Sequence, residues 1–144
     1  MFTKFIKIET NLKDSDIDNY NLSNSDRNKM IDIFSKFDYV EFKREDFNCF
    51  FCAVHINYIP QLLTFLSDIS VEFTYNDLSK DILFGILTNT KDLCFESEQE
   101  EVKLKNMIDN FINDNLTVDI VLDKILELGK NCLTSKDIQV LENF

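Results

Sequence analysis

Apolar positions in the first half of the chain fall into short strand-like stretches separated by two stretches with helical spacing. Alternation, or a short apolar run, is typical of strands and covers residues 2–10, 39–43, 49–56 and 71–75. Spacing of three and four residues predicts two helices, one capped by Ser23 and one with Pro60 in its first turn. The order β-α-β-β-α-β predicts an α+β fold with a ferredoxin-like (βαββαβ) body.

The last third of the chain has helical spacing throughout and predicts three helices. The first has an apolar stripe made of Leu104, Ile108, Phe111 and Ile112. The second has Thr117 as its N-cap and ends at Gly129. The third begins at Thr134, where Asp137 completes a capping box. We expect this third helix to bury Ile138, Leu141 and Phe144.

Residues 77–95 fit two interpretations. The apolar run at 82–87 fits a fifth strand beside the fourth, and it equally fits a helix capped by Asn76. Residues 93–95 fit a short strand or a buried connector. An acidic run follows and marks a boundary. We therefore expect an α+β sheet domain over residues 1–95 and a C-terminal helical unit over residues 96–144, packed together as one compact domain.

Residues 118–144 combine an acidic-Leu-Asp-Lys-Ile stretch with a later Gly, a Leu-Thr pair, an acid and a Leu. The pattern is carried by Asp119, Leu122, Asp123, Lys124, Ile125, Gly129, Leu133, Thr134, Asp137 and Leu141. It resembles the short C-terminal helical-hairpin tail of some bacterial proteins, including rhomboid-type membrane protease homologues. The resemblance implies a bacterial lineage and a docking tail. It implies no catalysis, because no apolar run in this chain reaches the length of a transmembrane helix.

The composition is that of a globular protein of one domain. The chain has 144 residues, of which 44% are hydrophobic and 28% charged. The N-terminal residues MFTKFIKIET lack the apolar segment of a signal peptide, so we expect a cytoplasmic protein with reduced thiols. Two Gly and one Pro, beside many Asn, Lys, Ile and Phe, indicate an A+T-rich genome of bacterial or phage origin.

The charge narrows the range of partners. The net charge is −11, with a local concentration of acids in the run from Phe95 to Glu101. Such a field repels phosphate backbones and favours a basic protein partner. The predicted partner-binding residues are Phe95, Glu96, Glu98, Glu100 and Glu101. The alternative is that acidity only keeps the protein soluble.

The stretch CFFCAVHI at 49–56 contains Cys49, Cys52 and His55, residue types that can bind metal or act in catalysis. In a strand, Cys52 points away from the other two, and Cys49 lies about 20 Å from His55. We therefore predict buried core cysteines, no metal site and no catalytic residues. A zinc site completed by Cys94 or Cys132, or a pair of His55 with one of these thiols, remains the alternative.

Two further motifs are incomplete. Asp14, Asp16 and Asp18 have the spacing of a calcium loop, but its sixth and twelfth positions are Asn19 and Ser25 instead of Gly and Glu. With two glycines in the chain, there is no glycine-rich phosphate loop. We expect no cofactor.

These observations favour a non-enzymatic interaction protein. The predicted function is that of an inhibitor, immunity-type or anti-defence protein that occludes a basic surface of its partner, without direct nucleic-acid or membrane binding. One alternative is a small enzyme or ligand binder that uses a cleft between the sheet and the C-terminal helices. Another is a homo-oligomeric structural subunit, and a homodimer is left open.

Overall fold

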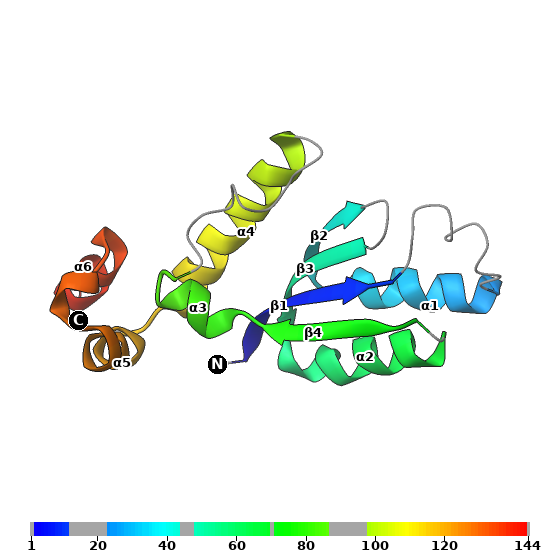
Figure 1. The fold of residues 1–144 in the computed structure, drawn as a ribbon, viewed down its shortest axis with the longest axis horizontal. Helices are drawn as coiled ribbons and strands as arrows, with labels where there is room; N and C mark the ends of the chain where they lie inside the picture. Colours follow the sequence, from blue (N-terminus) through cyan, green and yellow to red (C-terminus); the bar gives the residue numbers. More distant parts are fainter. Residues whose placement is uncertain (1, 12–22, 44–47, 70, 87–97, 144) are drawn as a thin grey trace.

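In the part of the chain that the structure describes, four strands form one antiparallel sheet in the order β2-β3-β1-β4, so the α+β class is confirmed. The computed structural model describes residues 2–11, 23–43, 48–69, 71–86 and 98–143 (Figure 1). The strands are β1 (Thr3–Thr10), β2 (Asp38–Lys43), β3 (Asn48–His55) and β4 (Phe73–Asp77). β1 and β3 are central and mostly buried, whereas β4 is an exposed edge strand two residues further along than predicted.

Two helices cover one face of the sheet: α1 (Asn24–Phe34) and α2 (Ile59–Asp68), the latter preceded by the short turn η2 (Ile56–Tyr58). Ser23 caps α1 as predicted, and its hydroxyl accepts a hydrogen bond from the backbone N–H of Asp26 at 3.1 Å. The core beneath these helices consists of Ile6, Ile8, Ile33, Cys52, Val54, Leu62, Phe65 and Leu66.

The opposite face is covered by α3 (Ser79–Leu83) and α4 (Glu98–Asn115). The core on this face is formed by side chains from strands and helices, namely Phe5, Val40, Phe42, Cys49, Phe51, Ile82, Leu83, Leu104, Met107, Ile108 and Phe111. Within the ambiguous segment, Ser79–Leu83 forms the helix α3, and the described part of the apolar run, residues 82–86, contains no strand. Asp77 rather than Asn76 stabilises the start of α3, because the Asp77 carboxylate accepts from the N–H of Ser79 at 2.9 Å. The predicted connector at 93–95 lies outside the described residues.

The C-terminal residues form a hairpin of α5 (Val118–Leu128), the turn η4 (Lys130–Cys132) and α6 (Ser135–Glu142). The predicted caps are confirmed: Thr117 begins α5, Gly129 ends it with φ +86°, and Thr134 and Asp137 form a capping box. The prediction that Ile138 is buried is wrong, because its side chain is 45% exposed.

The hairpin lies at the end of the molecule opposite α1 (Figure 1). Within the described ranges, no helix has the length and apolar character needed to cross a membrane.

Candidate functional site

Two adjoining hollows form a groove along one flank of α4. Their volumes are about 680 and 540 Å³, and both are lined by Asp38, Met107 and Asn110. The α4 side of the groove runs from Glu98 to Asn115, which corresponds to about 26 Å at 1.5 Å per residue. The other side comes from the start of β1, from β2 and β3, and from Ile120 of α5.

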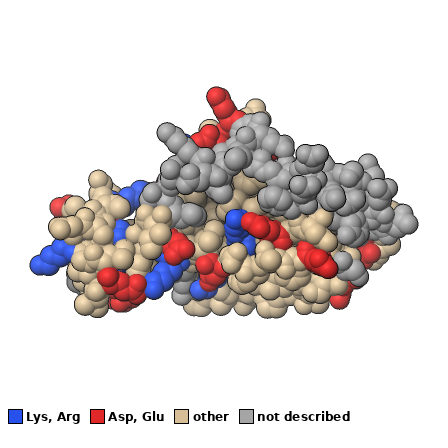
Figure 2. All heavy atoms as spheres, viewed as in Figure 1, with Lys and Arg blue, Asp and Glu red and all other residues tan. Residues whose placement is uncertain are grey.

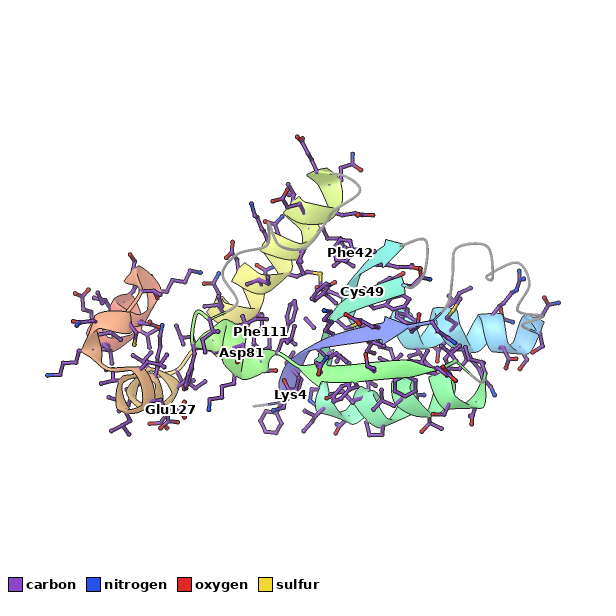
Figure 3. All side chains as sticks on the ribbon, in the orientation of Figure 1. Lys4, Phe42, Cys49, Asp81, Phe111 and Glu127 are labelled. Carbon is purple, nitrogen blue, oxygen red and sulfur yellow. The ribbon has the colours of Figure 1, made fainter. Side chains whose placement is uncertain are left out.

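The floor of this groove is apolar. Met107 and Phe111 are buried (Phe111 is labelled in Figure 3), and the Phe111 ring lies edge-on to the Phe5 ring of β1 with the centroids 5.6 Å apart. Two apolar side chains on its walls stay open to solvent, since Phe2 is 73% exposed and Val102 is 55% exposed. Exposed apolar side chains beside an apolar floor are typical of a binding surface.

The rim of the groove is acidic. Of the residues described by the structure, it carries three carboxylates and one lysine, namely Asp38, Glu98, Asp114 and Lys103. The ammonium group of Lys103 lies over the Tyr39 ring, 5.3 Å from its centroid. Amide side chains of Asn106, Asn110 and Asn115 add hydrogen-bond donors and acceptors.

The acidic run predicted from the sequence reaches this groove only in part. Glu98, Glu100 and Glu101 are in the first turn of α4, where acidic side chains project at the upper end of Figure 2. Glu98 lines the groove, whereas Glu101 forms an ion pair with Lys105 at 3.3 Å and Glu100 is partly buried. Phe95 and Glu96 lie outside the described residues.

Sequence reasoning missed the other rim residues. Asn106, Asn110 and Asp114 recur at spacings of four along α4, a signal that was available in the sequence. Asp38 is the first residue of β2, which is far from α4 in the sequence, and its place on the rim depends on the packing of α4 against β2.

The two cysteines of β3 are core residues, as predicted. Cys49 packs in the cluster beneath α4, and Cys52 packs in the cluster beneath α1 and α2. Burial, and secondarily the neighbouring Cys49, raises the pKa of the Cys52 thiol far above its ordinary value. In the part of the chain that the structure describes, no group of three His, Cys, Asp or Glu residues could hold a metal ion.

His55 and Cys132 are each bonded to backbone groups. The Nδ1 atom of His55 accepts from the N–H of Asn57 at 3.1 Å, and its ring stacks on Phe2 with centroids 6.2 Å apart. The Cys132 thiol donates to the carbonyl of Gly129 at 2.7 Å. The His55 side chain thereby caps the start of η2, and the Cys132 thiol bonds to Gly129, the residue that ends α5. Cys94 and the aspartates at 14–18 lie outside the described residues.

A buried ion pair joins the two helices of the C-terminal hairpin. Lys124 is 1% exposed, and its Nζ lies 2.6 Å from Oδ2 of Asp137, which also accepts from the N–H of Thr134 at 2.8 Å. Burial alone would raise the pKa of Asp137, but the hydrogen bonds from Lys124 and Thr134 outweigh it and lower that pKa. The ion pair therefore holds α5 against α6.

The chain was compared with protein families, curated proteins and solved structures. No protein-family model, curated protein or solved structure matches it.

Proposed function

We propose that the protein is a non-enzymatic interaction protein that binds a basic surface of a partner protein through the groove beside α4. The observation that carries the proposal is the combination of an apolar floor with the three rim carboxylates of Asp38, Glu98 and Asp114. An arginine or lysine fits such a groove, because its aliphatic stem packs on apolar surface while its charged head meets a carboxylate.

The action we propose is occlusion, as in an inhibitor or immunity-type protein. The net charge of −11 would steer a basic partner toward the protein, and the groove would then fix its orientation. Exposed Phe2 and Val102 would be covered in the complex and would supply apolar contact. Binding is expected to weaken as salt is added, because the steering field is screened.

A peptide-display selection against the full-length protein tests this proposal. Enriched peptides should contain Arg or Lys next to apolar residues. A synthetic copy of such a peptide should bind the protein in a fluorescence anisotropy titration. The variant Asp38→Lys/Glu98→Lys/Asp114→Lys should weaken that binding by tenfold or more, since it reverses the rim charges.

A matched control changes the net charge by the same amount at exposed acids away from the groove. We choose Asp68→Lys/Glu72→Lys/Asp123→Lys, because these three side chains are exposed and do not line the groove. If both triple variants lost the same affinity for the peptide, the result would contradict the proposal, since the affinity would then depend on net charge alone. Charge reversal of the acidic run itself, at Glu96, Glu98, Glu100 and Glu101, shows whether the run contributes beyond Glu98.

A small-molecule site in the same groove is the second candidate. The hollow of about 680 Å³ lies between sheet residues, such as Thr3 and Ala53, and helix residues, such as Phe111 and Ile120. Its volume falls in the usual range for ligand pockets. Mass spectrometry of the purified protein under native conditions separates the two candidates, because a stoichiometric bound molecule would favour this one.

We also infer that residues 3–77 have the ferredoxin-like arrangement. Support comes from the element order β1-α1-β2-β3-α2-β4, the antiparallel strand order β2-β3-β1-β4, and the packing of α1 and α2 in one cluster on the same face. An experimental structure in which β1 does not lie between β3 and β4 would contradict it.

A further inference from the structure

A second cavity lies on the other flank of α4, where α3, α4 and the C-terminal hairpin meet. Its volume is about 370 Å³, and it adjoins a hollow of about 320 Å³ through three shared residues, Ile112, Leu116 and Lys136. Junctions between structural units are common places for ligand sites, and this volume is within their usual range.

The wall of this cavity is mainly apolar. It is formed by Ile82, Leu83, Ile108, Ile112 and Leu116. Ile82, Leu83 and Ile108 belong to the core beneath α4, so the base of the cavity is built of well-packed side chains. An aliphatic or aromatic group would find apolar contact there.

The charges on this flank differ from those of the acidic groove. Among the residues that the structure describes, three lysines and two aspartates line the cavity: Lys105, Lys124, Lys136, Asp109 and Asp137. Lys124 is bonded to Asp137, and Lys105 to Glu101. Lys136 instead donates to the side-chain oxygen of Asn113, a neutral amide, across the gap between α6 and α4.

We propose that this cavity binds an apolar monocarboxylate, with the carboxylate at Lys136 and the apolar part against Leu83, Ile112 and Leu116. A carboxylate would replace the neutral amide as the partner of the Lys136 ammonium and form the stronger charge-assisted hydrogen bond. Asp109 on the same wall disfavours a polyanion such as phosphate. The site lies apart from the acidic groove and does not depend on the function proposed for it.

Protein-observed NMR with octanoate and phenylacetate tests the proposal and separates aliphatic from aromatic ligands. At least one acid should give saturable shifts at Leu83, Ile112 and Leu116, with intermolecular NOEs to their methyl groups. The neutral analogue, 1-octanol or 2-phenylethanol, should bind about tenfold more weakly, since it cannot form the ion pair. Equal affinity for acid and alcohol, or the absence of saturable shifts at millimolar acid, would overturn the proposal.

Two variants locate the carboxylate. Lys136→Gln should weaken binding of the acid about tenfold and leave the alcohol unchanged, because it removes the charge and keeps a donor for Asn113. Lys130→Gln is the matched control, since Lys130 is an exposed lysine of the same hairpin that does not line the cavity. Unchanged affinity of Lys136→Gln for the acid would overturn the assignment. The NOEs of the unmodified protein decide the location independently of any variant.

Discussion

The thiols of Cys49 and Cys52 lie inside the protein, and this position controls their chemistry. β3 is a central strand, so its successive side chains enter two different cores. Cys49 and Cys52, three residues apart, fall on opposite faces and cannot bind one ion together. A thiolate is the reactive form of cysteine, and burial in apolar surroundings suppresses it.

The three described cysteines should therefore differ in reactivity. With iodoacetamide at about pH 8, Cys132 should be alkylated first, because it is partly exposed. Cys49 and Cys52 should react only after urea is added, since burial raises the pKa of Cys52 and shields both thiols. Peptide mass spectrometry measures modification at each position. Alkylation of Cys52 in the native protein at the rate of Cys132 would contradict this.

The C-terminal hairpin relies on polar contacts more than the sheet does. Several of its apolar side chains face solvent, including Leu126, which is 84% exposed. Its two helices are joined by the buried Lys124–Asp137 pair, and Asp137 also takes part in the capping box at the start of α6. A further ion pair, between Lys80 and Glu127 at 3.0 Å, links α5 to α3. Glu127 is labelled in Figure 3. Removing one partner of a buried pair leaves an uncompensated charge.

Asp137→Asn should therefore lower the free energy of unfolding of the hairpin by about 3–5 kcal/mol, because the ammonium group of Lys124 stays buried without the Asp137 carboxylate as its partner. Hydrogen exchange of the amides in α5 and α6 should accelerate by at least about 100-fold, while β1 and β3 stay protected. Asp123→Asn, at an exposed acid of α5, is the control and should change little. The double variant Lys124→Met/Asp137→Asn should recover part of the loss. Unchanged protection of α5 in Asp137→Asn would refute the role of the pair.

At the scale of the whole molecule, the hollows on the two flanks of α4 differ in the charged side chains that line them. The net charge of the protein is −11, and on the face shown in Figure 2 acidic and basic side chains are interspersed over the body and the hairpin. The described groove on one flank of α4 has mostly carboxylates, while the cavity on the other flank has three lysines and two aspartates. This difference is why we assign the two flanks to ligands of opposite charge.

Acid pH should weaken the folded state through specific carboxylates. Burial favours a raised pKa for Asp77, but hydrogen bonds from Ser79 and the nearby Lys4 outweigh it, so the pKa of Asp77 is lowered. The folded protein then binds this proton less readily than the unfolded chain. The resulting stabilisation is complete above about pH 5 and is lost as the pH falls below about 4.

Urea unfolding of the unmodified protein and of Asp77→Asn, measured at several pH values, checks this expectation. Their difference in the free energy of unfolding should be largest near neutral pH and shrink on acidification. Acidification also changes the repulsion among all the acidic side chains. This effect is nearly the same in both proteins, which differ by one charge, so it cancels in the difference between their free energies of unfolding. Asp68→Asn, at an exposed residue of α2, serves as control. If the difference in the free energy of unfolding did not change with pH, this would contradict a lowered pKa of Asp77 in the folded protein.

Local patterns predicted most of the elements because they depend on neighbours in the sequence. Ser23, Thr117, Thr134 and Gly129 mark helix ends through contacts within a few residues. The alternation around Cys52 likewise placed it opposite Cys49. The run at 82–87 could not be assigned, since a short apolar stretch suits a strand or a helix equally and only its packing partners decide.

The sequence by itself determined the α+β class, the helix caps, the acidic charge and the absence of a glycine-rich phosphate loop, because each depends on composition or on short-range contacts. Only the tertiary structure decided that Ile138 faces solvent, that Asp38 joins Asp114 on one rim, and that Lys136 reaches Asn113. These facts depend on how α4 and the hairpin pack against distant segments. Side-chain periodicity identifies the apolar face of a helix but not the element that will cover it.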